Sequence, residues 1–432
     1  MRGKTASLTM ETLEKAEVKK GAAAVWFPAA AVGLAIRLAV IPFLYHDWMD
    51  PFVAEHWAFG RVAHSLISGH GFGNVFSDSG PTAVLPPVYA YLLAGVFRVF
   101  GDHTATSVIT ALAINSLFSA ATCVPVFLVA RQAFGDRVAK WACWGWALYP
   151  YGIYYGADWA WSTCLVTLEL AWLFLWAWRL ENSTRTRDWL LFGLFGGFAA
   201  LTEPIVLAVV PLLALWTLYL RARQGRSWKA PLVAGALGAL VIISPWIIRN
   251  YEVFNEFIPI RGGFGLELYI GNNGYSARWV NSAFHPNHND EELAEYERVG
   301  ETAYMHHKSD QAKAFIRSHP GWFAWMTLRR IVYMWSGYWS FDRAYLKDEP
   351  LDPPNIFVDT TMSILALLGL RRVFQRNSSL AMRFAVVLVF FPLAYYFSHP
   401  ETYYFRPVDP LIVVLAAVTV GIRKPQPPQV AA

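Results

Sequence analysis

The chain is dominated by apolar runs of a length that spans a lipid bilayer. A membrane-spanning helix needs roughly 20 mostly apolar residues, because each residue advances the helix by about 1.5 Å. Ten runs come near that length: residues 24–45, 105–130, 138–156, 160–179, 188–202, 205–221, 230–248, 355–370, 382–398 and 408–422. Hydrophobic residues make up 55% of the 432 residues, and charged residues only 16%. We therefore expect an all-α polytopic membrane protein with a bundle of about ten transmembrane helices.

The distribution of charge argues against nucleic-acid binding. The chain carries 36 Lys and Arg against 31 Asp and Glu, a net charge of +5. The basic residues lie between apolar runs instead of gathering on one face, which is the pattern of membrane topology. Cys123, Cys143 and Cys164 all fall inside apolar runs without the spacing of a metal site or a disulfide framework. We expect them to be packing residues.

The short run at 86–100 decides which side of the membrane every later loop faces. It is near the lower length limit for a span and carries Arg98. If it crossed, the basic segments at 131–140, around 185, after 221 and after 370 would all face outward, against the preference of short basic loops for the cytoplasm. We therefore expect 86–100 to lie in the membrane interface and both termini to be cytoplasmic.

This topology divides the chain into a few parts. We expect a cytoplasmic basic tail (1–23), a transmembrane core (24–248) with a first extracytoplasmic loop (46–104), an extracytoplasmic segment (249–354), C-terminal transmembrane helices (355–422) and a cytoplasmic tail (423–432). The basic start and the apolar run after it look like a signal peptide, but no small-residue cleavage site follows. We interpret the run as a retained first span. Asn289 is expected to cap one helix from about Asp290 to Ser318, and Trp322 to Tyr338 to form a helix on the membrane surface.

The first loop combines acidic residues with an amphipathic helix. Phe59, Val62, Ala63, Leu66 and Ile67 fall on one helical face, and His56, Gly60, Arg61, His64 and Ser65 fall on the other. Glu55 stands at the N-terminal turn, where the helix dipole favours a carboxylate. It is either a capping acid or a catalytic base held at the membrane–water boundary.

Several motifs resemble those of a known enzyme family. They are VAHSLISGHGF (62–72), GPTAVLPPVY (80–89), ARQAFG (130–135), WALYPYGIYYG (146–156), ALTEP (200–204) and, most specific, SPWIIRNYEVFNEFIPIRGGFGLELYIGNN (244–273). Together they resemble the GT-C glycosyltransferases of the protein O-mannosyltransferase and aminoarabinose-transferase type. The resemblance implies a GT-C-like bundle with extracytoplasmic juxtamembrane helices. It also implies transfer of a sugar from a polyprenyl-phosphate donor to a protein, glycolipid or polysaccharide at the outer face of a bacterial plasma membrane.

The resemblance assigns roles to acidic residues. The family's catalytic acid in the first loop falls on Glu55, although Asp is commoner there, and Asp50 is the fallback. The second acidic position falls on Ser162, and Asp158, one turn earlier, is the only nearby replacement. The alternative role for Asp158 is a helix-start cap.

A departing lipid phosphate needs positive charge to stabilise it. Arg249, Asn250, Arg261 and Arg406 lie near the expected outer interface and are candidates for this role. Glu267 and His56 complete the set of substrate-binding candidates. Each arginine has an alternative role, because it could snorkel to lipid phosphates or pair with a loop carboxylate. A divalent cation is the alternative to arginine. No metal ligands are assigned, since His306 and His307 diverge by about 100° on a helix.

The resulting hypothesis is an inverting transferase in which Glu55 removes a proton from an acceptor hydroxyl. The alternative is a non-catalytic or transporting membrane protein that handles lipid-linked sugars, such as a flippase or an assembly subunit. A transporter is expected to show related halves with polar groups at the midplane, and no repeat is visible. Arg37 and Glu169 lie inside predicted spans, where they could pair, line the donor cavity or clamp helices together.

Overall fold

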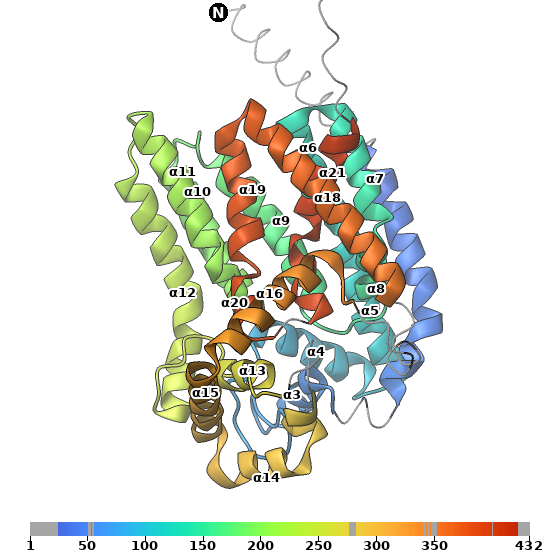
Figure 1. The fold of residues 1–432 in the computed structure, drawn as a ribbon, viewed down its shortest axis with the longest axis vertical. Helices are drawn as coiled ribbons and strands as arrows, with labels where there is room; N and C mark the ends of the chain where they lie inside the picture. Colours follow the sequence, from blue (N-terminus) through green and yellow to red (C-terminus); the bar gives the residue numbers. More distant parts are fainter. Residues whose placement is uncertain are drawn as a thin grey trace, which may run out of the picture.

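The protein consists of a bundle of long helices with a layer of shorter helices across one end (Figure 1). The computed structural model describes residues 25–50, 53, 56–275, 282–339, 343, 346, 352–399 and 401–421. Within these ranges there is no β-strand, and one isolated bridge joins Gly73 and Pro81. The prediction of an all-α membrane bundle with juxtamembrane helices is confirmed.

Each of the ten predicted spans coincides with helical structure. The bundle contains the first helix (residues 25–44), η1 (Tyr45–Met49), α5 (Ala105–Ala121), α6 (Cys123–Phe134), α7 (Asp136–Ala147), α8 (Pro150–Ala157), α9 (Thr163–Arg179), α10 (Thr186–Thr202), η2 (Pro204–Ala208), α11 (Val210–Arg223), α12 (Lys229–Phe254), α18 (Asp352–Arg376), α19 (Ser378–Phe390), α20 (Leu393–Phe397) and α21 (Asp409–Gly421). Among the described residues, five helical segments are long and apolar enough to cross a membrane: Val25–Met49, Ala105–Phe134, Pro204–Arg223, Lys229–Phe254 and Ser378–Phe397. The protein is a multi-pass membrane protein.

The layer is built from the first loop and the segment after α12. Its elements are α3 (Ala58–Ile67), α4 (Pro87–Phe100), α13 (Phe264–Gly271), η3 (Ser282–Phe284), η4 (Pro286–His288), α14 (Asp290–Val299) and α15 (Glu301–Ser318), while α16 (Pro320–Ser336) leads back to the bundle. Figure 1 shows α4 lying across the ends of the bundle helices. The 3-10 turns η5 (Thr402–Tyr404) and η6 (Arg406–Val408) precede α21.

One helix prediction in the layer is wrong, and its cap is right. The Asn289 side chain accepts hydrogen bonds from the N–H groups of Glu291 and Glu292, as expected of an N-cap. The single helix expected over 290–318 is two helices, because Gly300 has φ +82° and ends α14. Glycine adopts this left-handed conformation without steric cost, and so the chain turns there.

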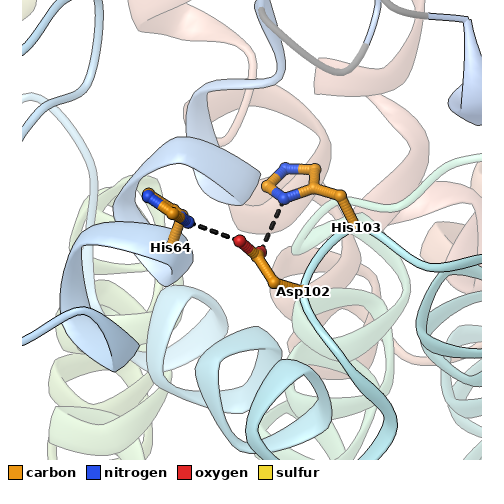
Figure 2. A group of neighbouring side chains, drawn as sticks. All are labelled: His64, Asp102 and His103. Carbon is orange, nitrogen blue, oxygen red and sulfur yellow. Dashed lines mark hydrogen bonds and ion pairs between the residues drawn. The ribbon is translucent and has the colours of Figure 1, made fainter.

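The amphipathic helix of the first loop packs as predicted on its apolar side. Phe59, Val62 and Ala63 of α3 are fully buried, largely against α4. The predicted polar side is partly wrong, because Gly60 and Ser65 are buried too. On the remaining exposed side, His64 faces Asp102 and His103 in the turn between α4 and α5 (Figure 2).

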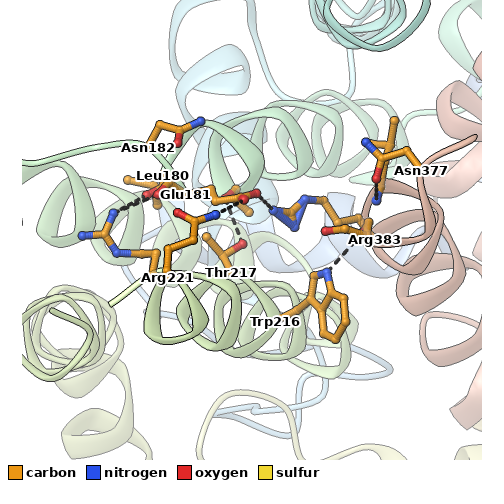
Figure 3. Close-up of polar contacts among 12 residues, drawn as sticks. Leu180, Glu181, Asn182, Trp216, Thr217, Arg221, Asn377 and Arg383 are labelled. Atoms are coloured by element: carbon orange, nitrogen blue, oxygen red, sulfur yellow. Dashed lines mark hydrogen bonds and ion pairs between the residues drawn. The ribbon is translucent and has the colours of Figure 1, made fainter. Parts of the chain in front are cut away.

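At the opposite end of the bundle a second polar cluster joins helix ends (Figure 3). The buried guanidinium of Arg383 on α19 forms an ion pair with Glu181, just after α9. Arg221 on α11 donates hydrogen bonds to the carbonyl groups of Leu180, Glu181 and Ser183 at 2.6 to 3.1 Å. These contacts satisfy carbonyls that the end of α9 leaves without helical partners.

Arg37 is the charged residue of the first helix, and its side chain joins that helix to its neighbours. Its Nε donates to Ser119 Oγ (3.0 Å) and to the carbonyl of Gly152 (2.9 Å). Its Nη1 donates to the carbonyls of Gly33 (2.8 Å) and Ala147 (2.9 Å). The side chain is 0% exposed, and its partners lie on α5, α7 and α8 as well as on its own helix.

Glu169, the other charge predicted inside a span, is held separately from Arg37. Its Oε1 accepts a hydrogen bond from Thr202 Oγ1 at 3.0 Å, which joins α9 to α10. The described contacts of Arg37 and Glu169 therefore support helix clamps, one of the roles that the sequence left open.

Replacing Arg37 with Leu is expected to lower the thermal unfolding temperature of the detergent-solubilised protein by several degrees. The change removes the free-energy cost of placing a charge in the membrane. It also leaves buried carbonyl groups without a hydrogen bond, and each such group costs about 1–3 kcal/mol of stability. Arg137→Leu is the matched control, because Arg137 is exposed at the start of α7. Equal unfolding temperatures for the two variants would contradict the clamp.

His285 is expected to make the stability of the layer depend on pH. The ring packs against Phe76 at 5.0 Å between centroids, and Nδ1 accepts the N–H of Asn287 at 3.1 Å. Burial lowers the pKa of His285 from 6.5 to about 4. As pH falls from about 6.5 to 4, the unfolded chain takes up a proton that the folded chain refuses, so stability should fall over this window.

Hydrogen exchange of the layer from pH 7 to pH 4 measures this loss. His285→Asn keeps an acceptor for the Asn287 N–H and should flatten the dependence, whereas His70→Asn, at an exposed position, should leave it unchanged. An equally steep dependence in His285→Asn would show that another group controls it.

Candidate active site

A narrow cavity lies where the ends of the bundle helices meet the layer. Its volume is about 30 Å³. It is lined by Phe59, Leu85, Pro86, Trp161, Ser162, Thr163, Val166, Glu203, Arg261, Phe391, Tyr395, Tyr403, Tyr404 and Pro407. These residues come from α3, the first loop, the start of α9, the end of α10 and the segment before α21, which are far apart in the sequence.

Arg261 is the cation of this cavity. It follows α12, and its Nε donates to the carbonyl of Val84 at 2.7 Å while Nη2 pairs with Glu267. Burial by itself lowers the pKa of Arg261, but Glu267 and Glu203 outweigh that effect and raise the pKa above its usual value. The guanidinium is therefore firmly charged.

Glu267 connects Arg261 to His399. It lies on α13, and its Oε2 is 3.3 Å from His399 Nε2, while its main-chain oxygen is 3.1 Å from His399 Nδ1. Although burial acts to raise the pKa of Glu267, Arg261 and then His399 lower it below its usual value. The carboxylate is ionised and fixes the position of the arginine.

Ser162 and Glu203 bring a second carboxylate to the cavity. Ser162 Oγ donates to Glu203 Oε2 at 3.3 Å. Burial raises the pKa of Glu203, and Arg261 opposes that shift. The sequence did not single out Glu203 as a site residue, although an acid directly before Pro204 at the end of an apolar run was a usable signal.

Aromatic residues line one part of this cavity. Tyr395 and Tyr404 stack with ring centroids 4.6 Å apart. Tyr403 packs against Trp159 at 4.9 Å and Trp161 at 5.9 Å. Such rings present apolar faces together with hydroxyl groups that can hydrogen-bond a polar ligand.

Arg249 fastens the first loop to α12, and Asn250 fastens the segment that follows α12. Arg249 donates to the carbonyls of Phe72 and Thr82, each at 2.7 Å, and its guanidinium lies 5.0 Å from the Trp246 ring centroid. Asn250 Nδ2 donates to the carbonyl of Ile258 at 3.0 Å. Neither residue lines the cavity around Arg261.

Arg406 lies between two carboxylates. Its Nη1 is 3.2 Å from Asp359 Oδ1 and 3.4 Å from Asp409 Oδ2, and the guanidinium lies 4.0 Å from the ring centroid of Tyr151. It lines a separate cavity of about 10 Å³. The structure therefore does not bring Arg249 and Arg406 together with Arg261.

The predicted first-loop base, Glu55, lies outside the described residues. Asp50, its fallback, ends η1, and its Oδ1 accepts the N–H of Val53 at 3.4 Å. The ring of His56 stacks on His288 with centroids 5.8 Å apart, and its carbonyl accepts from Asn287 at 3.1 Å. The catalytic roles of these residues stay predictions.

Asp158 is next to the first loop. Its carbonyl accepts a hydrogen bond from Trp48 Nε1 at 2.5 Å, and its side chain is buried. Burial raises the pKa of Asp158, and the charge of Asp47 adds to that shift. Asp158 ends α8, so the structure does not support the alternative of a helix-start cap.

Comparison with known proteins supports the fold. The family model of dolichyl-phosphate-mannose-protein mannosyltransferases matches residues 84–248. The solved oligosaccharyltransferase of Archaeoglobus fulgidus, tethered with an acceptor peptide, is 14% identical over 93% of this chain and 49% of its own, with a TM-score of 0.54. Its complex with Zn and sulfate gives 14% identity, 92% and 48% coverage and a TM-score of 0.51. The chain thus spans about half the length of that enzyme.

A further solved structure has lower similarity. ArnT from Cupriavidus metallidurans bound to undecaprenyl phosphate is 13% identical over 92% of this chain and 78% of its own, with a TM-score of 0.42. None of the curated proteins matches the sequence significantly. The mannosyltransferase match within the core and the fold shared with the oligosaccharyltransferase agree with the resemblance found in the motifs. Residues 84–248 thus match the mannosyltransferase family model, and the chain shares its fold with the oligosaccharyltransferase.

Proposed function

We propose that this protein transfers a sugar from a polyprenyl-phosphate donor to an acceptor hydroxyl at the extracytoplasmic face of the membrane, with inversion at the anomeric carbon. The observation that carries the proposal is Arg261, a charged guanidinium that lines the cavity where the bundle meets the layer. Among the described residues, no hydrogen bond engages its Nη1 group, which can therefore donate a hydrogen bond to a phosphate oxygen.

The basic loops support the proposed orientation. Figure 1 shows that α6 passes into α7, and α11 into α12, at the end of the bundle opposite the layer. The helix ends and turns there carry Arg137 and Lys140, and Arg223 and Arg226, and the turn between α9 and α10 carries Arg185. Short loops rich in Lys and Arg stay in the cytoplasm, and so the layer would face outward. The donor phosphate and the acceptor would then meet outside the cell membrane.

Arg261 borders two cavities of different character. The cavity of about 30 Å³ has an aromatic wall and holds little more than one water molecule, so donor binding requires its side chains to move. Arg261 also lines a cavity of about 290 Å³ with polar residues such as Glu301, His306 and Lys313. Its volume is near the lower end of ligand cavities, about 300 Å³. A lipid phosphate at Arg261 could therefore have its sugar on the polar side.

Contacts on both sides of Glu55 in the sequence support its role as the base. Trp48 Nε1 donates to the carbonyl of Asp158, and Trp57 Nε1 donates to that of Ala160 at 3.1 Å. Both tryptophans thus fasten the first loop to the turn that ends at Ser162, which lines the Arg261 cavity. Asp50 and Asp158 are the alternative bases on the same turn and loop, and Glu203 offers the second carboxylate.

The proposed reaction needs one base and one cation. Glu55 takes the proton from the acceptor hydroxyl, whose oxygen forms a bond to the anomeric carbon. The bond between that carbon and the phosphate oxygen breaks, and the phosphate leaves with the electron pair. Arg261 stabilises the charge that develops on it.

Glu55→Gln is expected to reduce transfer by about 10²–10⁴-fold, because the amide cannot accept the proton. Release of undecaprenyl phosphate from undecaprenyl-phosphate hexoses, followed by mass spectrometry in membranes, measures the reaction. Expression and thermal unfolding should match the wild type, and Asp50→Asn should retain activity. Full activity in Glu55→Gln, with activity lost in Asp50→Asn or Asp158→Asn, would assign the base to the other residue.

Arg261→Gln is expected to weaken undecaprenyl phosphate binding roughly ten- to hundredfold, because a hydrogen bond to a charged group contributes about 1.5–3 kcal/mol. Binding to the purified protein in detergent can be followed by tryptophan fluorescence. Arg261→Lys keeps the charge beside Glu267 and should bind with intermediate affinity. Arg249→Gln is the matched control, and a larger loss there than in Arg261→Gln would move the phosphate site to Arg249.

A further inference from the structure

We propose that His64, Asp102 and His103 form a binding site for a Zn²⁺-like transition-metal ion. His64 lies on α3, and the other two residues lie in the turn between α4 and α5 (Figure 2). None of the three lines the cavity around Arg261. The proposal stands independently of the proposed transfer reaction.

The ligand atoms converge on one point between the two segments. His64 Nδ1 is 2.5 Å from Asp102 Oδ2, and His103 Nδ1 is 2.6 Å from Asp102 Oδ1. All three ligand atoms lie within 4.8 Å of one another, and no other group of three His, Cys, Asp or Glu residues in the described ranges does so. Zn²⁺ binds imidazole nitrogen and carboxylate oxygen at about 2.0–2.2 Å, so a small outward movement of the side chains accommodates the ion.

The turn is shaped to aim its two side chains at α3. Gly101 has φ +94° and His103 has φ +48°, so two of three consecutive residues are left-handed. That conformation is uncommon for a residue other than glycine, and such strain gathers at functional sites. Capping of α5 does not explain it, because Thr104 accepts the N–H of Ser107 and serves as the N-cap.

Both histidines present Nδ1 to Asp102, so a metal ion would bind at Nδ1 and each Nε2 would point away from it. A metal at Nδ1 leaves the proton on Nε2, which in metal sites has a partner of its own. His64 Nε2 lies 3.4 Å from Ser68 Oγ. His103 Nε2 is buried without a hydrogen bond among the described residues, and the ring stands edge-on to Trp57 at 5.9 Å and 88°.

Gly60 allows this close approach. A Cβ atom at this position would lie 2.6 Å from the Trp57 ring and 3.0 Å from His103 Nε2. The absence of a side chain therefore lets Trp57 and His103 pack together against α3.

The ligand set indicates the class of ion and its coordination. Two imidazoles and one carboxylate suit Zn²⁺ and related ions, whereas Mg²⁺ and Ca²⁺ prefer oxygen ligands. The side chains of His64 and Asp102 are 52% and 33% exposed, so water can fill a fourth position. A bound ion would join α3 to the turn between α4 and α5 and hold Trp57 in place.

Zinc binding by the untagged, full-length protein in detergent tests the proposal. After chelator treatment and dialysis against Zn²⁺, the wild type should retain one equivalent by elemental analysis, and Zn²⁺ should raise its unfolding temperature. His64→Gln and His103→Gln should each bind at least tenfold more weakly. His70→Gln, an exposed histidine of the same loop, should bind like the wild type.

Co²⁺ substitution adds a readout that does not depend on folding stability. A site of two imidazoles and a carboxylate should give visible absorption bands in the wild type and in His70→Gln, and the bands should be absent in His64→Gln. A metal-free His64→Gln protein that unfolds at the wild-type metal-free temperature shows that the fold is intact. The proposal is overturned if the wild type retains no zinc, or if both His64→Gln and His103→Gln retain it fully.

Discussion

The bilayer imposes the constraint on which the structure depends, because an ionisable side chain within it must find its partners in the protein. Arg37 donates hydrogen bonds to carbonyl groups of neighbouring helices, and Arg383 forms an ion pair with Glu181 at a helix end. With charges confined to such places, the polar chemistry gathers where the bundle meets its covering layer. Arg261 and Glu267 lie at this junction.

The candidate arginines look alike in the sequence, but their hydrogen-bond and ion-pair partners in the structure differ. Arg249 is occupied by two carbonyl groups of the first loop, and Arg406 is placed between Asp359 and Asp409. Arg261 is held by one carbonyl and one carboxylate, which orient it without enclosing it. Within the described part of the chain its Nη1 group makes no hydrogen bond, so Arg261 is oriented and can still bind a phosphate that enters and leaves the site.

The sequence predicted what depends on local pattern. Apolar length located helical structure at the ten predicted runs, and Asn289 marked the start of α14, because both signals act within one helix. The break at Gly300 was missed although glycine was visible there, since a long polar stretch favoured one helix. The meeting of Ser162 with Glu203, 41 residues apart, has no local signature. It depends on how α9 and α10 pack, as the approach of His64 to Asp102 depends on α3 and α4.

The contacts of Arg37 also affect how the chain inserts into the membrane during synthesis. Its partners Ser119, Ala147 and Gly152 follow it by 82, 110 and 115 residues. At about 5–20 residues synthesised per second, the charge waits on the order of ten seconds for its last acceptor. Until then the first helix carries an unpaired charge, which costs roughly 2.5–3.5 kcal/mol at a membrane centre. The first helix is therefore expected to remain beside the insertion machinery until α8 has been synthesised.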